Sequence, residues 1–492
     1  MRNNKIQMAL ILGITTLAAG CAVGPDYVRP KIDAPATFKE AQGWKQAQPK
    51  DDQPHGAWWE IYADSELNTL LRQVAISNQN VLVAEANYRK ARALVDASQA
   101  SYFPTVGLSA SSTRSHQGTG TTTANSGSAT GTNAVNTARG ITRNNSLSAN
   151  ASWEPDIWGK VRRTVESNAS GAEASAADLA NAQLSAQAEL AQDYFQLRAQ
   201  DTQKKLLDDT VAAYEKSLRL TKNRYAAGVV AKADVVQADT QLKTTQAQAI
   251  DLEIQRALYE HAIAVLIGKA PAEFSLPVAP LITPVPVLPV AIPSELLERR
   301  PDIAAAERLV ASANAQIGVA TAAFFPSLTL NASGGYQSSS FSKWLSAPNQ
   351  FWSLGPQIAA TLFDGDARRA QVRQAEAGYD ASVATYRQTV LSAFQAIEDD
   401  LVQLRVLQAE TEVQKSAVAA AEESLALTLN QYKAGTVSYL NVITAQATAL
   451  GNRRSLAQLD SRRLVASVLL VRDIGGGWDA QHMDEVDKHP AQ

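Results

Sequence analysis

The sequence predicts a mainly α-helical protein with a smaller β component of the kind found in transmembrane β-barrels, built as two similar halves. Three observations predict this fold class: an internal repeat, two very long helical patterns, and pairs of short segments in which apolar and small polar residues alternate. The repeat ties the other two together, because each half contains both patterns in the same order.

The repeat is visible as three matches in the same order. Residues 217–238 align with residues 424–445 at an offset of 207, with identical residues at 11 of 22 positions. Residues 196–198 and 403–405 are both Gln-Leu-Arg at the same offset, and residues 101–111 resemble residues 323–333 at an offset of 222. The offset changes because the first half has a longer loop. We therefore predict a duplication with halves of about 200 residues each.

Each half begins with a helix followed by two strands. The helices are expected around 64–101 and 301–323, and Pro104 and Pro326 end them. The strands are expected at about 105–113 and 146–154 in the first half, and at about 327–335 and 353–362 in the second. Val106, Leu108 and Ala110 alternate with small polar residues. Such a period of two fits a half-buried sheet in a soluble domain, and it equally fits transmembrane strands with lipid on one side and water on the other.

A long helix follows each strand pair, at about 159–226 and about 366–433. Neither stretch contains proline, and each has one interior glycine, Gly171 or Gly378. A helix of this length would extend roughly 100 Å. Its apolar seam advances by alternating steps of three and four residues, which is the coiled-coil repeat. The seam residues are Val211, Tyr214, Leu218, Thr221 and Tyr225, and then Val418, Ala421, Leu425, Thr428 and Tyr432.

Both long helices end in the same turn, Tyr-x-Ala-Gly, at residues 225–228 and 432–435. Gly228 and Gly435 suit the left-handed C-terminal cap of a helix, because glycine adopts positive φ at little cost. Shorter returning helices are expected at 233–268 and 440–472. Each half therefore predicts a helical hairpin.

The N-terminus has the pattern of a secretory signal. Arg2 and Lys5 precede a mostly apolar stretch that is too short to span a membrane, and small residues then lead to Cys21. This resembles the lipobox of bacterial lipoproteins. Cys21 is the single cysteine of the chain, so we predict cleavage before it and acylation of it. Ala22, in the place where an aspartate favours retention in the inner membrane, favours the outer membrane. An ordinary signal peptide or a buried free cysteine is the alternative.

Composition and motifs argue against other classes. The net charge of −3 and pI near 6.0 give no reason to expect nucleic-acid binding. Phosphate-binding, zinc-protease and serine-hydrolase motifs are absent, and the five histidines lack metal-ligand spacing. We expect neither an enzyme nor a bound metal or cofactor.

Taken together, the pattern resembles the outer-membrane factor (TolC-like) family, in its lipoprotein branch serving RND-type tripartite efflux systems. The resemblance covers the mature chain and rests on residues 21–27, Trp58-Trp59, Arg300-Pro301-Asp302-Ile303, the Phe-Phe-Pro strand entry and the paired turns. It implies a homotrimer with a 12-stranded barrel in outer-membrane lipid and a 12-helix periplasmic tunnel. It also implies a periplasmic adaptor (membrane fusion protein) and an inner-membrane RND-type pump as partners.

The resemblance places the functional switch at the far tip of the helical hairpins. There it predicts the gate and the adaptor contact. The candidate residues are Lys222, Asn223, Arg224, Tyr225, Gly228 and Asp234 in the first half, and Asn430, Gln431, Tyr432, Lys433, Gly435 and Asn441 in the second. Simple coiled-coil packing of the tyrosines and solvation of the charges is the other interpretation.

The predicted organisation is a signal peptide (1–20), a lipid-anchored extended segment (21–62), the first repeat (63–270), a proline-rich connector (271–294), the second repeat (295–472) and a polar tail (473–492). The predicted function is an exit duct that passively exports small toxic compounds or drugs. A TolC-type duct for protein secretion and a structural coiled-coil envelope lipoprotein are the alternatives.

Overall fold

The structure, a computed structural model, describes residues 22–32, 35, 37–40, 57–116, 141–286 and 299–478. The chain divides into two compact units. The first unit contains Met1–Val28, Arg92–Ala169 and Ala311–Asp380, and the second contains Arg29–Ala91, Ser170–Val310 and Ala381–Gln492.

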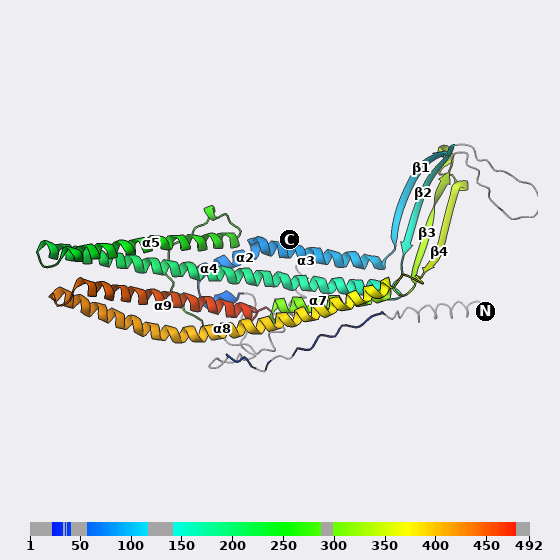
Figure 1. The fold of residues 1–492 in the computed structure, drawn as a ribbon. Coiled ribbons are helices and arrows are strands. Elements are labelled where there is room, and N and C mark those ends of the chain that lie inside the picture. The colour runs from blue at the N-terminus through cyan, green and yellow to red at the C-terminus, as the bar shows by residue number, and fades with distance from the viewer. Residues whose placement is uncertain are drawn as a thin grey trace, which may run out of the picture. The chain divides into compact units, whose positions relative to one another are not determined.

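The first unit holds a four-stranded antiparallel sheet in the order β1-β2-β3-β4 (Figure 1). The strands are β1 (Thr105–His116), β2 (Ile141–Trp153), β3 (Ser327–Ser338) and β4 (Gln350–Ala359). Because neighbouring residues alternate between faces, the register gathers the apolar side chains on one face. These are Val106, Leu108, Ala110, Leu147, Ala149, Ala151, Trp153, Leu328, Leu330, Ala332, Trp352, Leu354 and Ile358.

The strands are longer at their hairpin ends than the sequence predicts. β1 continues to His116 rather than 113, β2 begins at Ile141 rather than 146, and β4 begins at Gln350 and ends at Ala359 rather than spanning 353–362. The predicted bounds followed the apolar alternation. Ladder hydrogen bonds are made by the backbone, so pairing continues through polar residues such as Arg114 and Arg143.

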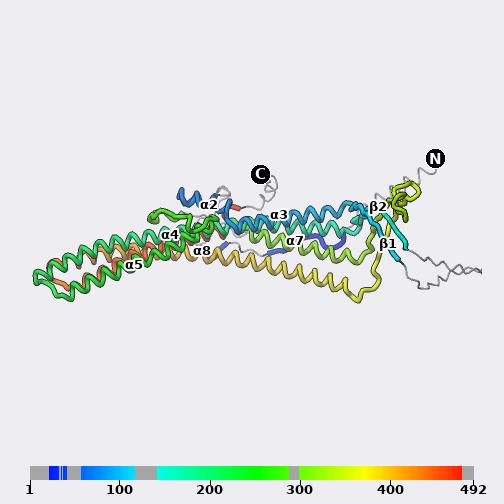
Figure 2. Tube along the Cα trace, turned by 90° about the horizontal axis from the view of Figure 1, so that it is seen from above, coloured from blue at the N-terminus to red at the C-terminus, as the bar shows by residue number. Residues whose placement is uncertain are grey.

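The second unit is helical. Its helical hairpins combine α4 (Lys160–Ala226) with α5 (Lys232–Leu266), and α8 (Ala367–Ala434) with α9 (Tyr439–Asp473). The first residues of α4, up to Ala169, and of α8, up to Asp380, belong to the first unit. Figure 2 shows both hairpins turning at the same end. The paired helices have nearly equal lengths, 67 and 68 residues for the long ones and 35 for both short ones. Among the described residues, none of the helices is both long and apolar enough to span a bilayer.

The first predicted helix, 64–101, is in fact two helices, α2 (Ser65–Ser77) and α3 (Gln79–Gln99). Asn78 separates them with an extended backbone, and its side-chain oxygen accepts the N–H groups of Asn80 and Val81 to cap α3. Its Nδ2 donates to the Leu266 carbonyl at 2.8 Å. The contact with the end of α5 thus stabilises the break between α2 and α3. The helical periodicity of the sequence does not reveal this break.

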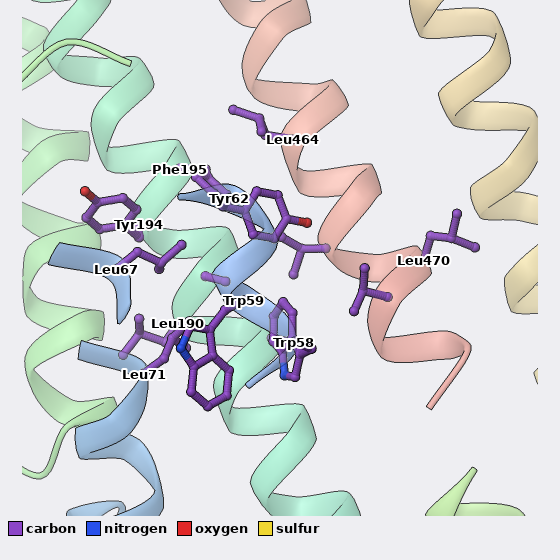
Figure 3. Close-up of a cluster of buried hydrophobic side chains, with 14 of the residues drawn as sticks. Trp58, Trp59, Tyr62, Leu67, Leu71, Leu190, Tyr194, Phe195, Leu464 and Leu470 are labelled. Atoms are coloured by element: carbon purple, nitrogen blue, oxygen red, sulfur yellow. The ribbon is translucent and has the colours of Figure 1, made fainter. Parts of the chain in front are cut away.

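The second unit's main core surrounds a short 3-10 helix, η1 (Trp58–Tyr62), which lies within the segment predicted to be extended. Its aromatic rings pack against α2, α4 and α9 (Figure 3). The Tyr62 hydroxyl lies 2.9 Å from Ser467 Oγ. The segment forms a helical turn and not an extended strand because the turn buries these rings. Burial of large aromatic side chains contributes strongly to stability.

The described part of the proline-rich connector runs along α4 and α5. Arg198 donates to the Pro277 carbonyl at 2.6 Å, and Arg256 donates to the Leu276 carbonyl at 2.6 Å. The buried carboxylate of Asp201 forms ion pairs with the guanidinium groups of both Arg198 and Arg256. The connector is therefore held by charge-assisted hydrogen bonds rather than by regular secondary structure.

The predicted polar tail begins later than residue 473. Helix α9 ends at Asp473, whose carbonyl accepts from Arg300 Nη1 at 2.7 Å. Trp478 packs beside a small buried cluster that includes Ala177 and Ala304. The chain up to Trp478 thus belongs to the packed unit, and residues 479–492 lie outside the described ones.

Candidate functional site at the hairpin tips

The two turns at the hairpin tips are built alike. Gly228 and Gly435 have φ values of +74° and +82°, in the left-handed region that favours glycine. Gly228 N–H donates to the Tyr225 carbonyl at 2.9 Å, and Gly435 N–H donates to the Tyr432 carbonyl at 3.0 Å. These bonds satisfy carbonyls left open where α4 and α8 end.

Arg224 links the first hairpin to the second. Its Nη1 donates to the Tyr432 carbonyl at 2.7 Å, and its Cζ lies 4.6 Å from the centroid of the Tyr432 ring. The carbonyl stands at the C-terminal end of α8, where the helix dipole is negative and favours a cation. The equivalent residue of the second hairpin is Gln431, which has no guanidinium, so the link is made in one direction only.

A second link joins α4 to α9. The hydroxyls of Ser217 and Tyr439 lie 3.1 Å apart, and the rings of Tyr439 and Tyr432 are 5.3 Å apart. Both tyrosines belong to a buried cluster with Tyr214, Leu218, Ala238, Leu242 and Val442. Burial raises the pKa of the Tyr439 hydroxyl, so it stays protonated and can donate or accept at neutral pH.

Residues 217 and 439 were not among the predicted site residues. A signal for one of them exists in the repeat itself: Tyr439 occupies the position of Lys232, as Arg224 occupies that of Gln431. Each of the two links therefore uses a position where the otherwise similar halves differ. Such differences mark the residues that make the halves unequal at the tip.

The two equivalent turn tyrosines lie in different surroundings. Tyr432 is 3% exposed, whereas Tyr225 is 46% exposed. The coiled-coil seam predicted for the first half is buried at Tyr214, Leu218 and Thr221 but not at Tyr225. Within a single chain the seam thus ends before Tyr225, and the packing of Tyr225 in an assembly stays a prediction.

The remaining candidates surround these links. Asp234 and Asn441 lie in the first turns of α5 and α9, and Asp234 is the acidic residue that favours a helix N-terminus. The exposed side chains are Lys222, Asn223, Asn430, Gln431, Lys433 and Asn441. The tip therefore combines a buried aromatic link between the hairpins with a rim of exposed polar side chains.

Cys21 lies outside the described residues, but the segment that follows it is held firmly within the first unit. Val23 N–H donates to the Trp158 carbonyl at 3.1 Å. Buried Arg163 donates to the carbonyls of Val23 and Gly24, each at 3.3 Å, and to Asp26 at 2.8 Å. A Cβ built on Gly24 would come 2.4 Å from Gly318 Cα, so only a glycine allows this close approach.

Comparison with known proteins decides the family. The sequence model of the outer membrane efflux proteins matches residues 70–269 and 292–476, one block in each half. The chain belongs to this family. It is thus an outer-membrane component of an efflux system, and the family is one of channels rather than enzymes.

Individual members of the family match over nearly their full length. The probable efflux pump outer membrane protein TtgC of Pseudomonas putida is 29% identical over 476 residues, 96% of either chain. The cation efflux system protein CusC of Escherichia coli K12 is 27% identical, over 93% of this chain and 96% of that one. The solved structure of the outer-membrane channel OprN superimposes with a TM-score of 0.84 at 32% identity, covering 93% of this chain and all of that one.

The predicted fold class is confirmed by this likeness to channels of the family. The prediction of an outer-membrane efflux channel is confirmed as well. The roles predicted for Cys21 and for the individual tip residues stay predictions.

Proposed function

We propose that three copies of this chain form a continuous exit duct, with a 12-stranded barrel in the outer membrane and a 12-helix tunnel in the periplasm. The observation that carries this proposal is the open sheet. Its outer strands β1 and β4 are 12 and 10 residues long and pair on one side only within the described part of the chain. Known bacterial barrels have at least eight strands and no free edge, and two further copies would supply the missing strands.

The helices support the same assembly. A stripe of apolar side chains lies exposed along α5, with Ile250 66%, Ile254 59% and Leu258 54% exposed. Val406, Val413 and Leu427 form a second stripe at heptad spacing on α8. Stripes of this size on an isolated chain indicate a protein partner, and neighbouring copies would cover them.

The face of the sheet opposite the apolar one supports passage of small compounds without strong selection by charge. It carries hydroxyl and amide side chains that bond to one another, such as Ser109 with Ser148 at 2.9 Å and Ser152 with Asn331 at 3.0 Å. We propose that the duct passively exports small toxic compounds or drugs. Related outer-membrane proteins are described as serving antibiotic and toluene efflux pumps.

The energy for export would come from an inner-membrane RND-type pump, joined to the duct by a periplasmic adaptor. We propose the hairpin tips as the gate and the adaptor contact. The links made by Arg224 and Tyr439 hold the two hairpins of one chain together, and the exposed polar rim offers an adaptor hydrogen-bonding groups.

We propose Cys21 as a lipid anchor after removal of residues 1–20. The ordered segment from Ala22 to Asp26 supports this, because it holds the new N-terminus within the unit that contains the sheet. A Cβ on Gly159 would come 2.8 Å from Ala22 Cα, so the residue next to Cys21 is itself packed. Cys21→Ser should abolish labelling of the protein by radioactive palmitate, and persistent labelling would contradict the assignment.

The test of the duct combines assembly and conduction. Purified full-length protein should have the mass of a trimer and should produce ion conductance in planar bilayers. Deleting its gene in a strain that expresses the pump operon should increase sensitivity to a broad panel of toxic compounds. A monomer without conductance, or unchanged sensitivity to the whole panel, would contradict the proposal.

A further inference from the structure

The strand hairpins carry positive charge without any compensating carboxylate. From residue 97 to residue 153 the sequence contains Arg114, Arg139 and Arg143 but no aspartate or glutamate. From residue 327 to residue 359 it contains Lys343 and again no acidic residue. Both stretches therefore carry a net positive charge at neutral pH.

Two of these arginines face each other directly. Arg114 of β1 and Arg143 of β2 are register partners, and His116 pairs with Ile141 two residues further on. Side chains that are opposite in an antiparallel pair have Cβ atoms about 5 Å apart, and like charges in that position repel. Both arginines are exposed and have no ion-pair partner in the described part of the chain, so no carboxylate there offsets their mutual repulsion.

The pair lies on the face of the sheet that carries the apolar residues. Alternation places Arg114 on the same side as Val106, Leu108 and Ala110. Val106 and Leu108 are 75% and 76% exposed, as expected for side chains that lipid covers. The two guanidinium groups thus continue the apolar face rather than the hydroxyl-lined one.

The position of Arg114 and Arg143 along their strands places them near the outer edge of the lipid layer. Arg114 is nine residues beyond Thr105, the helix-linked end of β1, which is about 30 Å along the strand. With a strand tilt of about 40° this becomes roughly 23 Å across the membrane, close to the apolar band of about 25 Å in outer-membrane barrels. At the same end of the sheet, exposed Lys343 lies between Phe341 and Trp344, whose rings are 5.7 Å apart. Aromatic and basic side chains together are typical of a membrane interface.

We propose that Arg114 and Arg143 bind the phosphate group of an anionic lipid in the outer leaflet, with Lys343 contributing to the same rim of positive charge. The inference rests on the proposed trimeric barrel, which sets the lipid-facing side. A phosphate accepts hydrogen bonds from both guanidinium groups and removes their mutual repulsion. Each protomer would hold one lipid headgroup at the outer boundary of the membrane.

The experiment is native mass spectrometry of the purified full-length trimer, titrated with bis-phosphorylated lipid A, with phosphatidylcholine and with inorganic phosphate. R114Q/R143Q should weaken lipid A binding about 25-fold, since a basic residue near an anionic lipid surface contributes roughly a fivefold factor. R114K/R143K keeps both charges and should keep most of the binding. The control R72Q/R89Q removes two exposed arginines outside the sheet and should leave lipid A binding unchanged.

Equal lipid A binding by wild-type protein and R114Q/R143Q would overturn the proposal. Inorganic phosphate binding as tightly as lipid A would also overturn it, because the site would then be a general anion site. Conductance of the same samples in planar bilayers tests the proposed duct separately from the proposed lipid site. Wild-type protein that conducts but does not retain lipid A refutes the lipid site alone, whereas wild-type protein that does not conduct refutes the duct.

Discussion

Arg224→Gln should loosen the resting tip. The change removes the guanidinium that donates to the Tyr432 carbonyl at 2.7 Å and that covers the Tyr432 ring at 4.6 Å. A hydrogen bond from a charged group contributes about 1.5–3 kcal/mol, and a cation–π contact at an exposed site about 0.5–1 kcal/mol. Because Arg224 is half-buried and water competes for its donors, we take the low end, about 2 kcal/mol, for the link in each chain.

A loss of about 2 kcal/mol shifts the equilibrium between the linked and separated hairpins roughly 30-fold. The assay is single-channel recording of the purified protein in planar bilayers, where the variant should spend a larger fraction of time in states of high conductance. The control is Arg219→Gln, which removes a more exposed arginine from α4 five residues earlier. Identical conductance of the wild-type protein and both variants would refute the role assigned to the link between hairpins.

Three further predictions concern stability, each measured by thermal unfolding of the purified protein. The buried hydroxyl of Tyr432 has no hydrogen-bond partner among the described residues, so Tyr432→Phe should leave the unfolding midpoint nearly unchanged. Tyr432→Ala should lower the free energy of unfolding by about 3–5 kcal/mol, because it removes the packed ring. Equal losses in both variants would contradict the packing role of the ring. Burial and the neighbouring carboxylate of Asp473 raise the pKa of Asp400 to about 8. The folded protein then keeps a proton that the unfolded chain releases, so this residue makes stability fall as pH rises from about 4 to about 8. Asp400→Asn should flatten the dependence of stability on pH and stabilise the protein at pH 8. An unchanged pH dependence would exclude Asp400 as its source. Asn78→Ala should cost at least about 1–2 kcal/mol, because it removes the cap of α3 and the hydrogen bond to the Leu266 carbonyl. Asn78→Ser, which keeps a capping oxygen and places no charge beside that carbonyl, should cost less; a reversed order would argue against the cap.

The sequence alone was sufficient for the features that depend on local physics. A repeat of 3.5 residues without proline predicts a long helix that packs against another, and both long helices are present. Gly228 and Gly435 mark turns because only glycine adopts positive φ cheaply. Alternation of apolar and small polar residues similarly located the four strands, although not their ends.

Only the tertiary structure decided how equivalent residues are used. Tyr225 and Tyr432 end the same motif, yet one is exposed and the other is buried beneath Arg224. The break at Asn78 and the packing of Trp58 at the centre of a core depend on segments more than a hundred residues away in the chain. Local propensity acts over a few residues, whereas burial and hydrogen bonding depend on which distant segments meet. The duplicated sequence therefore determined two similar halves, and their packing against each other made the halves different at the tip.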